Sequence, residues 1–386
     1  MEVWVRSGGR CVLCNAYLLE GALSARTLNL GELAHIVGQG VGARSPRGEY
    51  PLDPGLRDGA DNLMLLCERH HGEVDAQRAL DVFTVEQLRR LKREHEDRIR
   101  HVTGLGPERA TAVVRMLGSV HGRAVELSRE TAAEAVTAQR RFPLFLESYD
   151  RHGVEIDLRQ LPGERPVEDV VSAAAGSRAY YGHAVRVIDE VLEHRLRAGV
   201  ERGAVQHVSV FGFARLPLLV YLGARLDDTV PTEVFQRHRA EESWRWPDES
   251  GVSTRFEARV DQDVPAGDEA VVVVNVSGAI GRDEVPGELS MLRRYVISPV
   301  GVATGPDILC SRASLGCFED TLRGFLALLE AEAKTVRRLH VLPAVPMSAA
   351  VALGRAHHFQ VHPQWVIYER LAGSYVPTLE VGRSAG

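Results

Sequence analysis

Short apolar runs alternate with helical patterns in the last two thirds of the chain. The apolar runs are rich in β-branched residues and read VQHVSVFGF, AVVVVNVSGAI and RLHVLPAV. Segments with helical periodicity, PLLVYLGARL and SAAVALGRAH, follow the first and the third of these runs. This alternation predicts an α/β domain with a largely parallel sheet over residues 145–386.

Two of these strand and helix pairs resemble each other. VSVFGFARLPLLVYLG (208–223) and LHVLPAVPMSAAVALG (339–354) share an apolar strand, a loop with Pro and a helix ending in Leu-Gly, at a constant offset of 131 residues. Either the domain is duplicated, or two unrelated strand and helix units look alike. A duplication would place two equivalent strand-end loops around a pseudo-dyad, where a ligand with approximate two-fold symmetry could bind.

The pattern differs before residue 145. Residues 1–105 are rich in Gly, His and Cys and end in FTVEQLRRLKREHEDRIRHV, for which we predict a helix with Thr84 as its N-cap. Residues 106–144 are rich in Ala and contain no Pro between Glu108 and Phe142, so we predict one or two connecting helices there.

Length and charge limit the class of protein. A chain of 386 residues exceeds what one hydrophobic core usually supports, which favours two or three domains. No apolar run approaches the length of about 18 residues that a membrane span needs, so we expect a cytoplasmic protein without a membrane partner. The net charge of -6 gives no overall attraction to nucleic acid, so local arginines and metal ions would have to provide it.

The cysteines indicate a metal site. The chain has five, which is too few for a disulfide framework in a chain of this length. Cys11 and Cys14 form a C-x2-C pair, and Cys67 and His70 form a second pair with the same spacing. Together they predict a closed Cys3His site for a structural Zn²⁺. A redox-active C-x2-C is the alternative, but no strand precedes it as in thioredoxin-like proteins.

Further polar residues lie between and after the two metal-binding pairs. His35 follows Glu32-Leu-Ala, Asn62 precedes the apolar run that ends in Cys67, and His71 follows the zinc histidine. His35, Asn62 and His71, framed by the cysteine pairs over residues 4–100, resemble the HNH endonuclease family and its zinc-bound ββα-metal finger. The resemblance implies that His35 is the general base, that Asn62 fixes the loop and orients that base, and that His71 helps to hold a catalytic Mg²⁺ or similar ion.

One position departs from the family pattern, because Ala34 stands where many relatives have Asp before the base. The second protein ligand of the catalytic ion could then be Asp75, His35 itself or Asp61. His35 could instead be a hydrogen-bonded core histidine, and His71 a supporting or alternative zinc ligand. Arg44 and Arg47 in the glycine-rich loop are candidate DNA phosphate contacts, although loop arginines are often simply solvated.

The C-terminal segments HVSVFGFARLPLLVYLGARL, VFQRHRAEESWRW, VVVVNVSGAI and LHVLPAVPMSAAVALGR resemble the SAVED domain, a duplicated CARF-like sensor of cyclic oligonucleotides in bacterial CBASS anti-phage defence. The fold expected is therefore an HNH finger (1–105), a helical linker (106–144) and an α/β SAVED domain of two CARF-like halves (145–386). The resemblance implies an abortive-infection effector. A partner cyclase would supply a cyclic dinucleotide, the protein would pass from a dimer to a higher homo-oligomer, and the finger would cut double-stranded DNA without sequence preference.

Candidate ligand contacts combine aromatic side chains for base stacking with arginines and small residues for phosphates. They are Phe211, Arg215, Arg239, Trp244, Trp246, Ser277, Gly278, Pro346, Met347 and Ser348. For each of these residues alone, core packing is an equal alternative.

Two other functions fit the same sequence. A modification-dependent HNH restriction endonuclease would cut without a cyclic nucleotide, and a non-catalytic zinc finger would bind DNA without cutting it.

Overall fold

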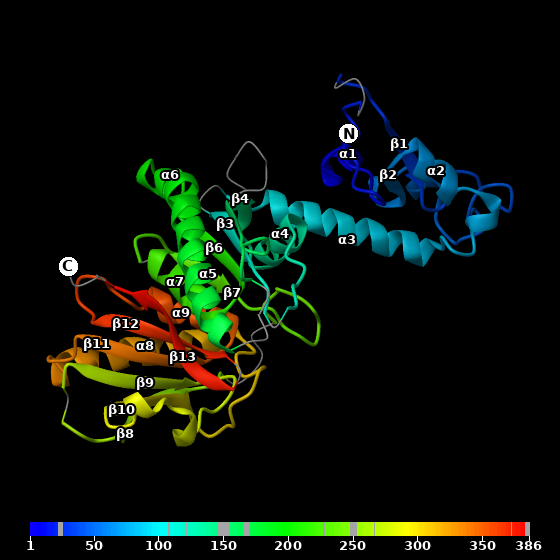
Figure 1. Ribbon diagram of the computed structural model, residues 1–386. Helices are drawn as coiled ribbons and strands as arrows, with labels where there is room; N and C mark the ends of the chain where they lie inside the picture. The colour runs from blue at the N-terminus through cyan, green and yellow to red at the C-terminus, as the bar shows by residue number, and fades with distance from the viewer. Residues whose placement is uncertain are drawn as a thin grey trace. The chain divides into compact units, whose positions relative to one another are not determined.

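The structure, a computed structural model, divides the chain into two compact units, Met1–Gly106 and Pro107–Gly386 (Figure 1). The residues that it describes are 1–21, 26–106, 109–120, 122–144, 154–164, 170–226, 228–247, 253–265, 267–371 and 373–382. In these residues no helix combines the length and the apolar composition that crossing a membrane requires.

The first unit is a β-hairpin followed by helices. Its elements are α1 (Glu2–Arg6), β1 (Gly31–His35), β2 (Leu63–Cys67), α2 (Glu68–Val74) and α3 (Val85–Thr103), with short 3-10 turns at Pro54–Leu56, Ala60–Asn62 and Gln77–Ala79. Strands β1 and β2 pair antiparallel, with His35 opposite Leu63 and Gly31 opposite Cys67. The hairpin and α2 therefore form a ββα arrangement that carries both His35 and the second metal-binding pair.

Helix α3 begins as expected and is anchored to the N-terminal segment. The Thr84 hydroxyl accepts a hydrogen bond from the Gln87 N–H at 3.2 Å, which confirms the predicted N-cap. His95 Nε2 donates to the Ser7 carbonyl at 3.1 Å, and its Nδ1 accepts from Arg98 at 2.9 Å. Burial lowers the pKa of His95, consistent with this neutral form. These contacts hold α3 against the turn that precedes Cys11.

A buried arginine shapes the glycine-rich loop between the two strands of the hairpin. Arg57 is only 2% exposed, although its guanidinium carries a full charge. Its donors reach five backbone carbonyls, those of Gly38, Gly40, Gly48, Tyr50 and Leu52. A Cβ at Gly48 would lie 2.6 Å from the carbonyl oxygens of Gly40 and Gly42, so this tight wrap requires glycine. The charge is thus solvated by the loop that surrounds it.

Two sheets form the second unit. The five-stranded sheet has the order β4-β3-β6-β7, with β5 also paired to β3, and all its pairs are parallel. The six-stranded sheet has the order β13-β12-β11-β9-β10-β8 and is parallel in its centre, with antiparallel strands β13 and β8 at its edges. The predicted α/β fold with largely parallel sheets is confirmed. The strands are β3 (Ala110–Leu117), β4 (Phe142–Leu144), β5 (Val154–Asp157), β6 (Val208–Phe213), β7 (Thr232–Phe235), β8 (Phe256–Gln262), β9 (Glu269–Asn275), β10 (Arg293–Pro299), β11 (Arg338–Ala344), β12 (Gln364–Leu371) and β13 (Ser374–Val381).

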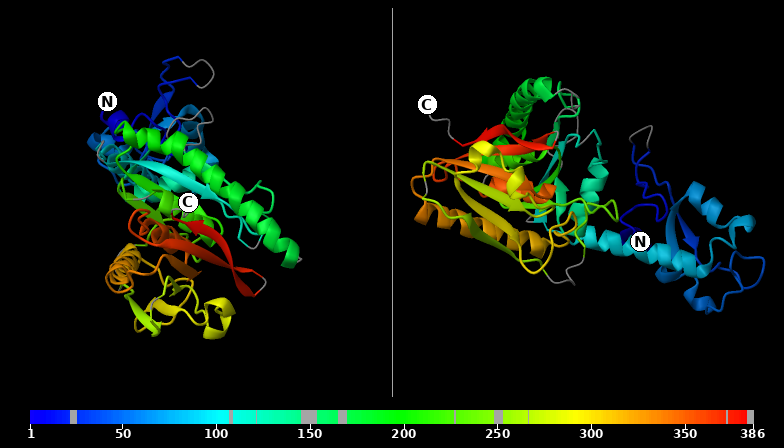
Figure 2. Two further views of the ribbon diagram at one scale, coloured as in Figure 1. Left: turned by 60° about the vertical axis from the view of Figure 1, so that its left-hand side comes forward. Right: turned by 60° about the horizontal axis from the view of Figure 1, so that its bottom comes forward.

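Helices cover the inner faces of both sheets. They are α4 (Arg129–Ala138), α5 (Val170–Val191) with its continuation as a π-helix (Leu192–Arg197) and α6 (Ala198–Glu201), α7 (Leu216–Leu226), α8 (Arg312–Glu332) and α9 (Met347–Arg355). Alternate residues of β9 divide between two cores: Val272 and Val274 join the main core, whereas Val271 and Val273 join a smaller one on the outer face. Two 3-10 turns, Arg282–Glu284 and Gly287–Leu289, cover that outer face, and α8 lies on the other side of the sheet (Figure 2, right).

The repeated segments adopt the same strand, loop and helix structure, and their helices cross at two glycines. A Cβ at Gly223 of α7 would collide with the carbonyl oxygen of Val351 and lie 2.9 Å from Arg355 N. A Cβ at Gly354 of α9 would collide with the carbonyl oxygen of Val220 and lie 2.8 Å from Ala224 N. Gly223, Val220 and Ala224 of α7 correspond to Gly354, Val351 and Arg355 of α9 at the same offset of 131 residues. This reciprocity favours duplication over chance likeness.

The prediction of connecting helices for residues 106–144 is wrong for its first part. Residues Ala110–Leu117 form β3, a buried strand that pairs with β4, β5 and β6, and only α4 is helical in this segment. The sequence ATAVVRML has alanine at helix-favouring positions, but tertiary pairing with β6 overrides that local preference. The second unit therefore begins at residue 107, not at 145.

The helix crossing predicts a specific response to methyl groups. Gly354→Ala should lower the free energy of unfolding of the second unit by about 1–3 kcal/mol, because the new methyl must push α7 and α9 apart. The measurement is urea unfolding followed by tryptophan fluorescence, since Trp244, Trp246 and Trp365 all lie in this unit. Gly324→Ala in α8 is the matched control. Its Cβ would meet no atom within 4 Å, so higher helix propensity should raise stability by up to about 1 kcal/mol. Equal effects of the two substitutions would contradict the close crossing.

Candidate metal centre and ligand-binding loops

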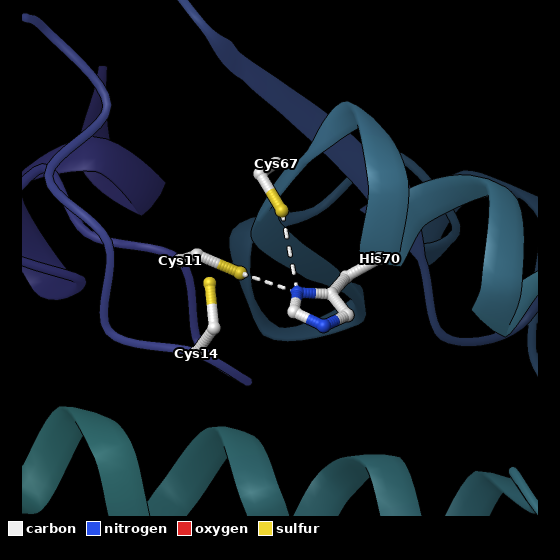
Figure 3. A group of neighbouring side chains, drawn as sticks. All are labelled: Cys11, Cys14, Cys67 and His70. Atoms are coloured by element: carbon white, nitrogen blue, oxygen red, sulfur yellow. Dashed lines mark hydrogen bonds between the residues drawn. The ribbon is translucent and has the colours of Figure 1, made fainter. Parts of the chain in front are cut away.

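The two predicted metal-binding pairs come together in the first unit. Cys11, Cys14, Cys67 and His70 place their donor atoms within 4.8 Å of one another (Figure 3). His70 Nδ1 lies 3.6 Å from Cys11 Sγ and 3.2 Å from Cys67 Sγ. A tetrahedral zinc ion with bonds of about 2.3 Å to sulfur and about 2.0 Å to nitrogen separates such ligands by roughly 3.6 Å. The quartet therefore fits a tetrahedral ion bound through Nδ1 of the histidine.

Backbone amides prepare one of the thiols for metal binding. Burial alone would raise the pKa of Cys11, but hydrogen bonds from the backbone N–H groups of Cys14, Cys67 and Leu13 lower it to about 7. Burial raises the pKa of the Cys14 thiol, and the neighbouring sulfur of Cys11 adds to this effect. Several thiols so close together cannot all ionise without a cation between them.

His35 and His71 take no part in this quartet. His35 ends β1, and its Nε2 lies 2.9 Å from Asp58 Oδ1. The imidazole of His35, followed by the amide of Gln39, lowers the pKa of the Asp58 carboxyl. With Nε2 donating to a carboxylate, Nδ1 is left as the acceptor nitrogen of the ring. Asp58, which lies in a loop 23 residues from His35, was not predicted from the sequence.

His71 lies between two carboxylates. Its Nδ1 is 2.6 Å from Glu32 Oε2, and its Nε2 is 3.4 Å from Asp75 Oδ2. Asp75 was one of three residues considered as a second ligand of the catalytic ion, whereas the proximity of Glu32 was not expected. Another of the three, Asp61, pairs with Arg6 at 2.8 Å and has no described contact with His71. Among the described residues, only the Cys3His quartet brings three or more metal-binding groups this close.

Asn62 holds the loop that follows His35. Its Oδ1 accepts from the Val37 N–H at 2.9 Å, and its Nδ2 donates to the carbonyls of Val37 and Arg57, both at 2.8 Å. The Asn62 carbonyl in turn accepts from the Ile36 N–H at 2.8 Å. The amide of Asn62 thus fixes the backbone immediately after His35.

The Arg47 side chain is buried and engaged within the first unit, and its assignment as a DNA phosphate contact stays a prediction. Its guanidinium donates to the carbonyls of Ile36, Val74 and His35 and pairs with Asp75 at 2.6 Å. The side chain is 5% exposed and ties the end of β1 to the end of α2. Arg44 is exposed, and its role as a phosphate contact stays a prediction.

In the second unit, the loops that follow β9 and β11 lie side by side. The N–H groups of Val276 and Ser277 both donate to the Ala344 carbonyl, at 2.9 and 2.8 Å, and a Cβ at Gly278 would be 3.9 Å from Ala344 Cβ. The segment Pro346–Ser348, which opens α9, follows directly. Five predicted ligand contacts, Ser277, Gly278, Pro346, Met347 and Ser348, therefore gather where the strand order of the six-stranded sheet reverses. Ser348 is itself buried, and its N–H and Oγ–H donate to Gln236 Oε1 at 3.2 and 2.7 Å. Gln236 follows β7 of the five-stranded sheet, so this contact joins the two halves of the second unit.

The five-stranded sheet has an equivalent pair of loops after β3 and β6. Gly118 donates to the Phe213 carbonyl at 2.6 Å, and the Ser119 hydroxyl donates to Glu164 Oε1 at 2.9 Å. Arg215, at the start of α7, donates to the Glu164 carbonyl at 2.8 Å and lies 4.5 Å above the Tyr180 ring. Burial and the Glu164 carboxyl raise the pKa of Tyr180. Arg215 is thus already engaged in this loop, and its contact with a ligand phosphate stays a prediction.

Three predicted stacking residues lie in the core instead. Phe211 is 0% exposed, stacks on Phe235 with ring centroids 4.3 Å apart and contacts Trp244 edge-on at 5.7 Å. Trp244 and Trp246 are also buried. The structure therefore favours the packing alternative for these three rings, and their assignment as ligand contacts stays a prediction. Arg239 is exposed and remains a candidate.

Gly118, Ser119 and Glu164 were not predicted from the sequence. The first two follow a strand that was interpreted as a helix, so no strand-end loop was expected there. The signal available in the sequence was the run AVVRML followed by Gly-Ser, which parallels VVVVNVSG after β9.

Comparison with solved structures gives distant likenesses. The Acinetobacter baumannii Cap4 SAVED/CARF-domain containing receptor with 2′3′3′-cAAA aligns at a TM-score of 0.43 and 12% identity, over 82% of this chain and 62% of that chain. The same receptor with 3′3′3′-cAAA gives 0.44 and 12%, over 81% and 61%. The Moraxella osloensis receptor gives 0.38 and 13%, over 77% and 59%. The chain thus spans about three fifths of the length of these proteins. Curated proteins gave no match.

A family model matches residues 188–381, which is half of the chain and includes both strand and helix repeats. Its description is "SMODS-associated and fused to various effectors sensor domain". The matched range lies within the second unit and covers α7, α9 and the loops at the ends of β6, β9 and β11. The chain therefore belongs to the SAVED family, and its second unit carries the sensor domain.

Proposed function

We propose that the chain is a cyclic-dinucleotide-activated, metal-dependent DNA endonuclease of CBASS anti-phage defence, with an HNH-type nuclease in its first unit. The observation that carries the proposal is a ββα hairpin whose Cys3His quartet leaves His35 and His71 free, on a chain with a sensor domain of a family fused to effectors. A purely structural finger has no use for two further histidines, each paired with a carboxylate.

In this proposal His35 is the general base. Asp58 accepts a hydrogen bond from Nε2–H and holds the ring, so that Nδ1 can take a proton from a water molecule attacking the DNA phosphate. Asn62 supports this role by fixing the backbone at Val37, two residues further along. Arg47 adds a second support because it donates to the His35 carbonyl.

The catalytic ion would be held at His71. Glu32 and Asp75 lie on either side of this imidazole, and carboxylate oxygens are the ligands that Mg²⁺ prefers. When bound, the ion would stabilise the charge that develops on the leaving oxygen. Glu32 is thus a candidate for the ligand that other HNH proteins take from the position of Ala34.

His35→Ala should reduce DNA cleavage by about 10²–10⁴-fold, because it removes the proton acceptor and leaves the hairpin intact. The measurement is plasmid degradation with Mg²⁺ and activator, beside the zinc content and the melting temperature. His101→Ala, an exposed histidine of α3, is the control and should cut normally. Unchanged cutting by a folded His35→Ala protein would contradict the assignment. Absence of cutting by the wild type, with DNA still retained, would favour a non-catalytic finger.

We propose zinc as the ion of the Cys3His quartet. The first unit has a small apolar core of 14 buried residues, so it depends on this ion for its fold. Cys14→Ser and Cys67→Ser should each leave about one zinc fewer per chain by elemental analysis. The same substitutions should abolish the protection of residues 1–106 from proteolysis. Cys310→Ser, at an exposed cysteine of the second unit, should change neither result. A metal-free protein with a protected first unit would refute the structural role.

The activator is proposed to bind at the strand-end loops of the second unit. The loops after β6 and β11 are related by the offset of the repeat, and the loops after β3 and β9 each lie beside one of them. The four loops therefore suit a ligand with approximate two-fold symmetry. A partner cyclase would make this ligand on infection. To switch the protein on, the ligand must bind the active assembly more tightly than the idle protein.

Assembly should accompany activation, because a nuclease that cuts any DNA must be inactive until the signal arrives. Light scattering on the full chain should show the molar mass rising from a dimer when the correct cyclic nucleotide is added, in parallel with plasmid degradation. A panel of cyclic di- and trinucleotides identifies the activator. Cleavage that begins without a change in mass would rule out ligand-driven assembly. Cleavage that needs no cyclic nucleotide would favour a modification-dependent restriction enzyme.

A further inference from the structure

A cavity of about 260 Å³ opens on the outer face of the six-stranded sheet. Its walls come from β8, β9 and β10 and from the segment that follows β9 and returns across the sheet. We call it the arginine cavity, and it is lined by Arg259, Asp261, Val273, Asn275, Ile280, Gly281, Arg282, Val285, Arg294 and Val296. It opens on the face of the small outer core, to which Val273, Val285 and Val296 belong. Asn275 and Ile280 of its lining flank the strand-end loop that follows β9.

Positive charge exceeds negative charge in this cavity. Three guanidinium groups converge on one carboxylate: Arg294 Nε lies 2.8 Å, Arg282 Nη2 3.0 Å and Arg259 Nη1 3.3 Å from the oxygens of Asp261. Two nearby carboxylates serve other arginines, since Asp263 pairs with Arg293 at 2.8 Å and Glu284 with Arg370 at 2.7 Å. The lining residues therefore carry a net charge of two positive units.

The most buried of these arginines has unused donors. Arg294 is 5% exposed, and only its Nε has an acceptor among the described residues. Its Nη1 and Nη2 groups carry four further N–H donors in a partly desolvated place. Asn275 adds another, because its Oδ1 accepts from the Ile280 N–H at 3.0 Å while its Nδ2 has no acceptor in the described parts of the chain. These donors are therefore available to an anionic ligand in the cavity.

The Asp261 carboxylate cannot by itself neutralise the three arginines of the cavity. Burial would raise the pKa of Asp261, but hydrogen bonds from Arg282 and Arg294 reverse this and lower it, so the group is ionised. Even so, one negative charge faces three positive ones. An anion with two charges and several acceptor oxygens would balance the site and occupy the free donors of Arg294 and Asn275.

We propose that the arginine cavity binds a small phosphomonoester. A phosphomonoester carries about 1.5 to 2 negative charges at neutral pH and offers three acceptor oxygens. Each phosphodiester of a cyclic nucleotide carries only one charge and fewer free oxygens. The apolar side chains of Val273, Ile280 and Val285 line the same cavity and would contact the organic part of the ligand. The site therefore selects monoesters over the cyclic diesters proposed for the sensor loops.

The test is isothermal titration of the full chain with inorganic phosphate and with a nucleoside 5′-monophosphate, at low ionic strength and without divalent ions. Arg259→Gln and Arg282→Gln remove charge from half-exposed or exposed side chains, so both variants should fold. Each should weaken phosphate binding by at least tenfold. Asp261→Asn removes the competing carboxylate and should strengthen it. Arg323→Gln, an exposed arginine of α8 paired with Asp320, is the control and should bind as the wild type does.

Melting temperatures of all variants establish that the fold is kept. Binding that weakens in both arginine variants and strengthens in Asp261→Asn supports the proposal. Tighter binding of the 5′-monophosphate than of inorganic phosphate shows that the apolar wall contributes. No binding to the wild type, or equal binding to the wild type and both arginine variants, overturns the proposal. Displacement of bound phosphate by a cyclic dinucleotide overturns the selection of monoesters.

Discussion

The second unit depends on the close crossing of α7 and α9. Gly223 and Gly354 have no side chain, and each lies against the backbone of the other helix. This contact brings the two strand and helix repeats together back to back. Ser348 at the start of α9 then reaches Gln236 beyond β7, and Arg215 at the start of α7 lies 3.9 Å from Glu369 of β12. A larger residue at either glycine would separate the two halves, and with them the loops that they present.

In the first unit, the proposed metal ion would have the corresponding role. The Cys3His quartet joins the turn at Cys11 to the junction of β2 and α2, and the hairpin then carries His35 at the far end of β1. Because one histidine of the adjacent pair completes the quartet, the other is free to lie between Glu32 and Asp75. The proposed catalytic site is therefore held in place by a structural site of different chemistry. Chelation should disturb both.

Several arginines in this chain hold the fold together through contacts with backbone carbonyls and carboxylates. Arg57 is surrounded by five backbone carbonyls, and Arg47 ties β1 to α2, so both guanidinium groups are occupied by contacts within the first unit. Arg215 holds the loop at Glu164. In the arginine cavity, by contrast, three guanidinium groups share one carboxylate and Arg294 keeps unused donors. The arginines that hold the fold differ from Arg294 in the number of acceptors around the guanidinium group, not in its charge.

The sequence by itself determined the metal quartet, the cap of α3 and the repeated strand and helix units, because each depends on local spacing or periodicity. The ββα hairpin was expected only from a family resemblance. Only the tertiary structure decided the rest. Residues 110–117 are a strand because β6 lies beside them, although their local propensity suggested a helix. Phe211 and Trp244 are core residues because they pack on each other. Asp58 meets His35, and Glu32 meets His71, only after the hairpin has folded. Burial and partners across 20 to 40 positions leave no periodic trace in a sequence, so such residues are found only when the chain is seen in three dimensions.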